Sequence, residues 1–250
     1  LNVWVAATAN AYINKSHWNQ CETDLTLEGM RGHHCILGLD LSSGGDLTAG
    51  TLEFELENNK YFISGHAFMP SSRILEHEKT DKAPYRIWHQ TGQLDLTETL
   101  GGYKTDYKYI IAYYKRLQTE YDIKIDLIAY DPHNADAFLQ DLDEFGCDLV
   151  SITQSARSLN DATEDFKNSV DAHEILHNPE NDILTWCFFN ASVVSNSFGE
   201  KKIDKEHRSS RIDIVDSTID AHVMVLRKSD ASLDCNSSIS NFLKWTEGKS

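Results

Sequence analysis

The sequence predicts an α/β domain built on a central mixed sheet, with three antiparallel strands followed by parallel strands, and helices on its faces. Two observations carry this prediction. Residues 34–69 hold three strand-like runs in succession, and from residue 107 onward apolar strand-like runs alternate with segments of helical periodicity. Strands joined by tight turns form antiparallel sheets, whereas strands separated by helices form parallel ones.

The antiparallel part is predicted from three runs joined by turn residues. HHCILGLDLS (33–42) is a short apolar run typical of a buried strand, and SGGD (43–46) has turn composition. LTAGTLEFEL (47–56) alternates as a strand does, ENNK (57–60) predicts a hairpin turn, and YFISGHAFM (61–69) returns as a third strand.

The rest of the chain alternates between the two patterns. Residues 70–91 are polar and predict short helices, and GQLDLT (92–97) predicts a short strand. Asp106 is suited to cap a helix over 107–121, because its carboxylate can accept from free N–H groups of the first turn. Further strands are predicted at 123–131, 147–153 and 183–194, and further helices at 134–146 (ended by Gly146), 159–170 and 212–226. The RNase H-like fold has this order of elements.

Length and charge limit the functions to be considered. The 250 residues suit one large domain, and no apolar run is long enough to span a membrane. The chain begins with Leu1, so we expect a piece of a longer protein. With 23 Lys and Arg against 39 Asp and Glu, the net charge of −16 argues against binding DNA over the whole surface. The five cysteines include no C-x-x-C pair, which favours reduced thiols inside a cell.

Aspartates stand where the elements of such a fold would bring them together. Asp40 ends the first predicted strand, and Asp131 ends the strand IKIDLIAYD at a strand-to-helix junction. Asp213, Asp216 and Asp220 are spaced by three and four residues, so they share one face of the final helix. We expect Asp220 to pair with a neighbour on the surface. Taken singly, an aspartate at a strand end is more often a cap or turn residue than a catalytic one.

Converging carboxylates predict a metal site. Three of them cannot remain ionised together unless a cation neutralises them. Oxygen ligands favour Mg²⁺ or Mn²⁺ over zinc, and two such ions about 3.5–4 Å apart suit phosphodiester cleavage.

The stretch HEILH (173–177) has the H-E-x-x-H spacing of helical zinc peptidase sites. Pro179 follows two residues after His177, so a helix cannot continue there, and no third ligand stands in a helical context. A structural role for these histidines is therefore favoured over a zinc site.

A basic segment, KKIDKEHRSSR (201–211), stands out in this acidic chain and predicts a local DNA contact, with a solvated loop as the equal alternative. Its positive side chains are Lys201, Lys202, Lys205, Arg208 and Arg211. No G-x-x-x-x-G-K-[ST] sequence is present, so no ATP site is expected in this chain.

Six segments in order resemble the C-terminal nuclease domain of the terminase large subunit of tailed bacteriophages. They are LNVWV (1–5), GLDLSSGGDLTA (38–49), GQLDLTETLGGYKTDYKYI (92–110), YDPHNADAFLQDLDEFG (130–146), ILHNPENDILTWCFFNASVV (175–194) and RIDIVDSTIDAH (211–222). The resemblance covers nearly the whole chain. The departures are the extra residues of TETLGGYK and His133, which stands where an aromatic residue is common in the family.

The resemblance implies roles for single residues. Asp40, Asp131 and Asp213 match the catalytic aspartates, and Asp216 matches a position that is often acidic and joins the metal ligands. Asp46 matches a family aspartate at a turn, where we expect it to cap the hairpin. Matches expected to serve packing or hydrogen bonding are Asn134, Gln154, Trp186 and Asn190.

The implied function is that of a metal-dependent endonuclease that cuts concatemeric viral DNA during packaging, with two Mg²⁺ or Mn²⁺ ions. Residues 1–250 would form one domain, with 1–32 leading in from an ATPase domain and 228–250 as a C-terminal tail. Implied partners are double-stranded DNA, that ATPase domain, the small terminase subunit and the portal, in the host cell cytoplasm and with no membrane. The alternatives are another RNase H-like enzyme, such as a Holliday-junction resolvase or transposase, and a non-catalytic module that docks DNA or the portal.

Overall fold

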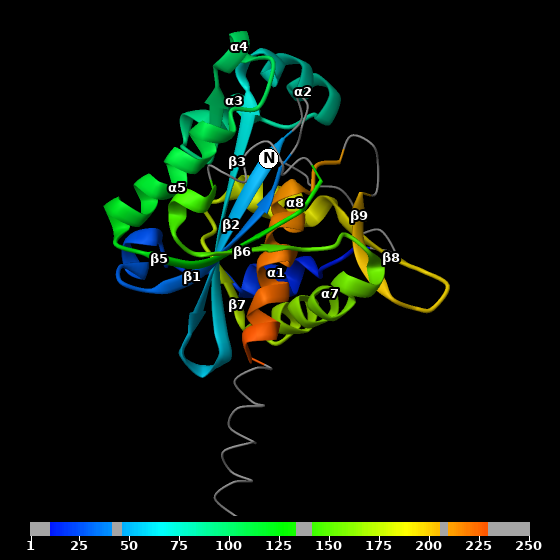
Figure 1. Ribbon diagram of the computed structural model, residues 1–250. Coiled ribbons are helices and arrows are strands. Elements are labelled where there is room, and N and C mark those ends of the chain that lie inside the picture. The colour runs from blue at the N-terminus through cyan, green and yellow to red at the C-terminus, as the bar shows by residue number, and fades with distance from the viewer. Residues whose placement is uncertain (1–10, 42–46, 134–141, 206–209, 230–250) are drawn as a thin grey trace, which may run out of the picture.

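A mixed seven-stranded sheet forms the centre of the molecule, with helices on both faces (Figure 1). The structure is a computed structural model and describes residues 11–41, 47–133, 142–205 and 210–229. The strands are β1 (His34–Asp40), β2 (Thr48–Leu56), β3 (Lys60–Pro70), β4 (Leu94–Thr97), β5 (Lys124–Tyr130), β6 (Asp148–Ser151) and β7 (Ile175–His177). Their order is β4-β3-β2-β1-β5-β6, with β7 also paired to β3.

Strand directions confirm the predicted mixed sheet. β1, β2 and β3 are antiparallel neighbours, whereas β5 runs parallel to β1 and β6 parallel to β5. At the other edge, β4 and β7 both run parallel to β3. The predicted turn at 57–60 is also confirmed: a 3₁₀ turn (Glu57–Asn59) places Asn58 and Asn59 at positive φ, which asparagine tolerates.

Several helices surround the sheet, and α5 has the bounds that the sequence predicts. Asp106 caps it by accepting a hydrogen bond from the backbone N–H of Tyr109. The helices are α1 (Lys15–Gln20), α2 (Ile74–Asp81), α3 (Tyr85–Gln90), α4 (Thr99–Gly102), α5 (Tyr107–Tyr121), α7 (Ala156–Asp171), α8 (Asp182–Asn190) and a last helix over residues 213–229. Shorter 3₁₀ turns lie at Leu27–Met30, Ser71–Arg73 and Asp143–Phe145.

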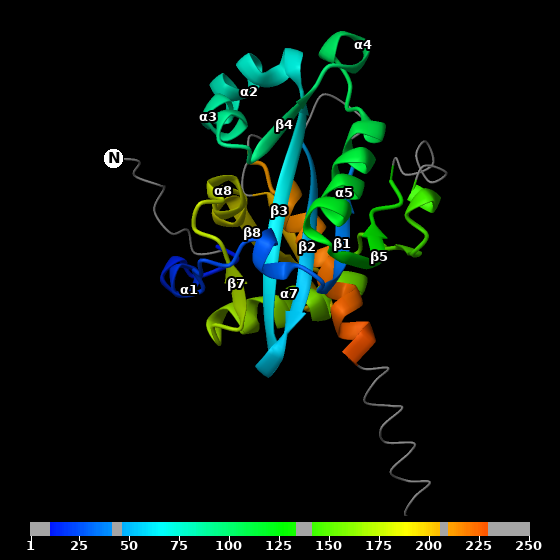
Figure 2. The same cartoon turned by 90° about the vertical axis from the view of Figure 1, so that its left-hand side faces the viewer.

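The two faces of the sheet carry separate hydrophobic clusters. Leu37 and Leu39 of β1 pack toward α5 with Tyr114, whereas the other face is covered by α7, α8 and the last helix. In Figure 2, α5 lies in front of the strands and the orange last helix lies behind them. Alternation along β1 therefore directs Ile36, Gly38 and Asp40 toward the last helix.

The last helix lies unusually close to β1. A Cβ at Gly38 would stand 1.8 Å from the carbonyl oxygen of Ser217 and 2.9 Å from the backbone nitrogen of Ala221. From the neighbouring strand, the hydroxyl of Thr51 lies 2.9 Å from that of Ser217. Glycine at position 38 thus permits a backbone approach that any larger residue would prevent.

A buried histidine ties the same helix to two other elements. His222 is fully buried, with Nδ1 2.7 Å from Glu53 on β2 and Nε2 3.1 Å from Asp165 on α7. Burial alone would lower the pKa of His222, but the two carboxylates raise it to about 9. The imidazole is therefore charged at neutral pH and bridges the helix to β2 and α7.

The predicted strand at 183–194 is wrong. α8 occupies most of it, and only Ala191–Ser195 is extended, as β8, which pairs antiparallel with β9 (Lys201–Lys205). A short apolar run does not distinguish a buried strand from a buried helix. The signal for the helix lies just before the run: the side chain of Asn181 caps it by accepting from Leu184.

The predicted helix at 134–146 is only partly described, because residues 134–141 lie outside the described residues. Gly146 adopts φ 67° and ends the 3₁₀ turn Asp143–Phe145, which confirms the predicted stop.

HEILH does not lie on a helix. α7 ends at Asp171, His173 has φ 58°, and Ile175–His177 forms β7. His177 is fully buried, stacks on Trp18 with ring centroids 4.1 Å apart, and its Nε2 lies 3.0 Å from the Trp18 carbonyl oxygen. The structural role of His177 follows from these contacts.

Residues 11–32, expected only as a lead-in, contribute to the core. Tyr12 and Trp18 are fully buried, and both stack on Phe188 of α8. Within the described ranges, none of the helices has the length and apolar character needed to cross a membrane.

Candidate metal centre

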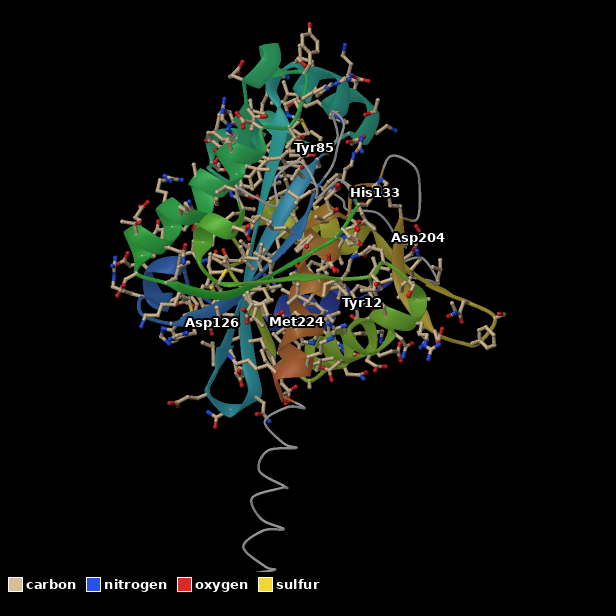
Figure 3. All side chains as sticks on the ribbon, viewed as in Figure 1. Tyr12, Tyr85, Asp126, His133, Asp204 and Met224 are labelled. Carbon is tan, nitrogen blue, oxygen red and sulfur yellow. The ribbon has the colours of Figure 1, made fainter. Side chains whose placement is uncertain are left out.

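A cavity of about 200 Å³ lies where β1 and β5 end. Leu39 pairs with Tyr130 in parallel register, so Asp40 and Asp131 follow side by side, and the N–H of Asp131 donates to the Leu39 carbonyl at 3.3 Å. The residues lining the cavity are Asp40, Asp131, Gln154, Leu159, Lys202, Ile203, Asp204, Lys205, Ile212, Asp216 and Asp220. Figure 3 labels His133, two residues after Asp131, and Asp204 of β9 on this side of the molecule.

The last helix brings its acidic face to the same place. It starts at Asp213, which is 6% exposed, and Asp216 and Asp220 face the cavity one and two turns further along. The apolar side chains next to this acidic face are buried in one hydrophobic cluster with residues of α7 and α8, which fixes the rotation of the helix. They are Ile212, Val215, Ile219 and Val223. The structure thus brings together the four aspartates that the sequence predicts as metal ligands, although Asp213 is not among the residues that line the cavity.

Electrostatics show how strongly these carboxylates interact. Burial raises the pKa of Asp40 well above its ordinary value, and the charges of Asp213, Asp216 and Asp131 raise it further, against an opposing effect of Lys205. The pKa of Asp216 is likewise raised by burial and then by Asp213 and Asp220. Protons or a cation must therefore neutralise part of this charge.

A hard divalent cation fits this donor set, because the acidic side chains offer only oxygen atoms. As they stand, the described His, Cys, Asp and Glu side chains form no group of three poised around one ion. Mutual repulsion keeps ionised carboxylates apart when no cation is present.

The predicted surface position of Asp220 is wrong. It is 1% exposed rather than on the surface, and the side-chain amide of Gln154 donates to its two oxygens at 2.9 and 3.2 Å. Burial raises the pKa of Asp220 despite the hydrogen bonds from Gln154, and the charges of Asp40 and Asp131 add to that effect. Asp220 is therefore another acidic neighbour of the cavity, and the hydrogen bonds from Gln154 orient it.

The basic side chains of residues 201–211 lie in different surroundings. Lys202 and Lys205 line the cavity from β9, whereas Lys201 pairs with Glu164 at 2.8 Å. Arg208 lies outside the described residues. Arg211 is 9% exposed and its guanidinium pairs with Asp81 at 2.9 Å, so it does not lie on an exposed basic face as the sequence suggested.

The other matched positions have structural partners where they are described. Trp186 is 5% exposed and packs on Trp88, with ring centroids 5.2 Å apart. The side-chain amide of Asn190 donates to the Arg211 carbonyl at 3.3 Å. Asp46 and Asn134 lie outside the described residues. Asp204 is a cavity residue that the sequence did not single out.

Comparison with known proteins decides the family. The model of the family described as terminase large subunit, endonuclease domain, matches residues 1–229. The chain belongs to this family. As a terminase nuclease domain, it is 28% identical over 209 residues to the terminase large subunit of Enterobacteria phage HK97, covering 83% of this chain and 40% of the relative. It is 27% identical to Protein YmfN of Escherichia coli K12, covering 85% of this chain and 48% of that protein.

Solved structures agree with this placement. The crystal structure of the HK97 large terminase aligns with a TM-score of 0.74 at 27% identity, covering 85% of this chain and 43% of that one. The large terminase nuclease of the thermophilic phage G20c, solved with bound magnesium, aligns at 0.54 and 13% identity over 86% of this chain and 98% of that one, which shows the fold alone. The predicted RNase H-like fold is confirmed. The terminase nuclease domain described here spans less than half the length of its curated relatives.

Proposed function

We propose that this domain is a metal-dependent endonuclease that cleaves double-stranded, concatemeric viral DNA during genome packaging. The observation that supports it most directly is the cavity where Asp40, Asp131 and Asp216 converge, with Asp213 close enough to perturb Asp40. Sequence and fold similarity place the chain among nuclease domains. The large terminase nuclease of phage G20c, which has a similar fold, has crystal structures with bound magnesium and with bound cobalt.

The residues at the cavity would have three roles in cleavage: holding the metal ions, orienting the carboxylates and binding the DNA phosphates. Asp40, Asp131, Asp213 and Asp216 would hold two Mg²⁺ or Mn²⁺ ions, which when bound supply an activated water and stabilise charge on the leaving 3′-oxygen. The backbone N–H of His133 donates to one oxygen of Asp131 at 2.8 Å and so orients its carboxylate. Gln154 does the same for Asp220. Lys202 and Lys205, on the wall that β9 forms, would bind the phosphates that flank the scissile bond.

The partners follow from the same proposal. Other parts of the full-length protein would supply the ATPase domain, and the small terminase subunit and portal would bring the DNA, in the cytoplasm of the host. This chain contains no phosphate-binding loop sequence of the ATPase type, so ATP should not alter its cutting rate.

The test is cutting of supercoiled plasmid and linear duplex with Mg²⁺ or Mn²⁺. Asp40→Asn, Asp131→Asn and Asp213→Asn should each abolish cutting while circular dichroism shows an intact fold. Retention of wild-type rates by all three variants would refute the site. A strong preference for four-way junctions over linear duplex would favour a resolvase, and DNA binding without any cutting would favour a docking module.

A further inference from the structure

A buried ion pair holds the segment that leads into the last helix. Nε of Arg211 donates to Oδ2 of Asp81 at 2.9 Å, and Nη2 approaches Oδ1 at 3.5 Å. The two side chains are 11% and 0% exposed. Asp81 is the final residue of α2, so the pair joins residue 211 to an element that follows β3, on the side of the molecule where Tyr85 is labelled in Figure 3.

Both members of the pair have further polar partners. Asp81 accepts hydrogen bonds from the hydroxyls of Tyr85 at 2.8 Å and Thr80 at 2.7 Å. Nδ1 of His77 lies 2.8 Å from Nη2 of Arg211 and 3.3 Å from Oδ2 of Asp81, so this imidazole contacts both members of the pair. Burial alone would raise the pKa of Asp81, yet the contacts from His77, Arg211 and the two hydroxyls hold it well below its usual range. The pair is therefore fully ionised and fixed in one geometry.

The backbone at the same residue is held from another direction. The side-chain amide of Asn190, the last residue of α8, donates to the carbonyl of Arg211 at 3.3 Å. The helix begins immediately afterward, with the N–H of Asp216 donating to the Ile212 carbonyl at 2.9 Å. Residue 211 is thus fixed on both its side chain and its backbone, two residues before Asp213.

We propose that Arg211 is a positioning residue for Asp213: its pairing with Asp81 determines where the last helix begins and therefore how Asp213 meets Asp40. This inference rests on the proposed function, in which these two aspartates hold divalent ions. It replaces the expected DNA contact of Arg211 with a role in shaping the metal site. Asp81 and His77 share this positioning role because they hold the side chain of Arg211, although they belong to a helix that does not line the cavity.

Charge and position predict opposite effects on metal binding. If Arg211 acted only as a positive charge near the acidic cavity, its loss would strengthen cation binding. If it positions Asp213, its loss weakens binding, because the ligand is displaced. The double variant Arg211→Met with Asp81→Leu removes one charge of each sign, so the net charge stays constant and no buried charge is left unpaired. A changed affinity in this variant then reports geometry.

The experiment measures Mn²⁺ binding to the whole chain by isothermal titration calorimetry, alongside the metal-free melting temperature and plasmid nicking. The double variant should remain folded and bind Mn²⁺ roughly 10- to 100-fold more weakly, the range seen when outer partners of metal ligands are lost. Arg86→Met is the matched control. It removes the ion pair between Arg86, whose side chain is 64% exposed, and Glu78 at 2.8 Å. This pair joins α3 to α2 without reaching residue 211, so Mn²⁺ affinity should stay unchanged.

Arg211→Lys serves if the double variant does not fold. Lysine keeps the charge but cannot reproduce the paired guanidinium contacts, so Mn²⁺ affinity should fall several-fold while the salt dependence of DNA binding stays that of wild type. A folded variant of either kind with wild-type Mn²⁺ affinity and nicking overturns the inference and leaves the proposed function standing. Wild-type protein that neither binds Mn²⁺ nor cuts DNA overturns the proposed function itself, and the inference falls with it.

Discussion

Gly38→Ala should damage both the stability and the nuclease activity of this domain. The added methyl group would lie 1.8 Å from the Ser217 carbonyl oxygen and 2.9 Å from the Ala221 nitrogen. Both are backbone atoms of the last helix, so no side-chain rotation relieves the clash, and the helix must retreat by about 1.7 Å or more to reach ordinary van der Waals contact. Overpacking of this kind costs about 1–3 kcal/mol or more, which corresponds to a fall of about 2–4 °C in melting temperature per kcal/mol.

The effect on activity should exceed the effect on stability. The helix that retreats carries Asp213 and Asp216, while Asp40 stays on β1 two residues beyond the substituted glycine. A displacement of about 1 Å between catalytic groups can cost roughly 100-fold in rate. We therefore expect plasmid nicking to slow by about 100-fold when it is measured well below the melting temperature of the variant, with a higher Mn²⁺ concentration needed for half-maximal rate.

Gly29→Ala provides the control for this substitution. Its added Cβ would meet only the Leu25 side chain, at an ordinary 3.7 Å, so both melting temperature and nicking should stay near wild type. If Gly38→Ala shows a wild-type melting temperature and nicking rate, the helix does not pack on β1 as closely as described, and the geometry inferred for the aspartates is wrong.

Three further predictions concern the walls of the cavity and the helix behind it. Asp220→Asn should slow nicking by about tenfold or more, since the side chain faces the cavity, and a wild-type rate would show that Asp220 takes no part in cleavage. The pKa of His222 is raised to about 9, so its contribution to stability is complete below about pH 6.5 and is lost as the pH rises through 9. Urea unfolding should show the wild type losing more stability between pH 7 and 10 than His222→Gln, and equal losses would contradict the charged bridge. Lys202→Gln with Lys205→Gln should reduce the salt dependence of DNA binding by about one unit of slope per lost phosphate contact, whereas Lys201→Gln, already paired with an acid, should change it little.

The sequence predicted the sheet well because each local signal agreed with the fold. The apolar run at 33–42, the asparagines at 58 and 59 and the cap Asp106 are all short-range features, and each has the predicted role. The prediction failed where the deciding contact was distant. The run at 183–194 became a helix because a cap outside the run and packing against Trp18 outweighed its strand-like composition.

At the candidate site, too, local signals were predictive and contacts between distant residues were missed. Strand ends and helical spacing predicted that Asp40, Asp131 and the acidic face of the last helix would converge, and the family resemblance singled out Asp213 on that helix. The structure brings Asp40, Asp131 and two residues of that face, Asp216 and Asp220, to one cavity. The local signals did not reveal that Asp220 is buried, because its partner Gln154 is 66 residues away. Nor did they reveal that Arg211 points away from solvent, since a basic residue in a charged run is ordinarily exposed and its acidic partner lies 130 residues earlier.

A chain with a net charge of −16 can bind DNA at the cavity only if the negative charge there is offset locally. Acidic surface repels a duplex at long range, and that repulsion is screened within about 10 Å at 0.1 M salt. At the cavity itself, Lys202 and Lys205 oppose the carboxylates, lowering the pKa of Asp216 that burial and neighbouring charge raise. A bound divalent ion would act in the same direction and more strongly. Under the proposed function, the cation that prepares the site for chemistry also neutralises the charge that would otherwise repel the scissile phosphate. Metal binding and DNA binding are therefore coupled at the same carboxylates.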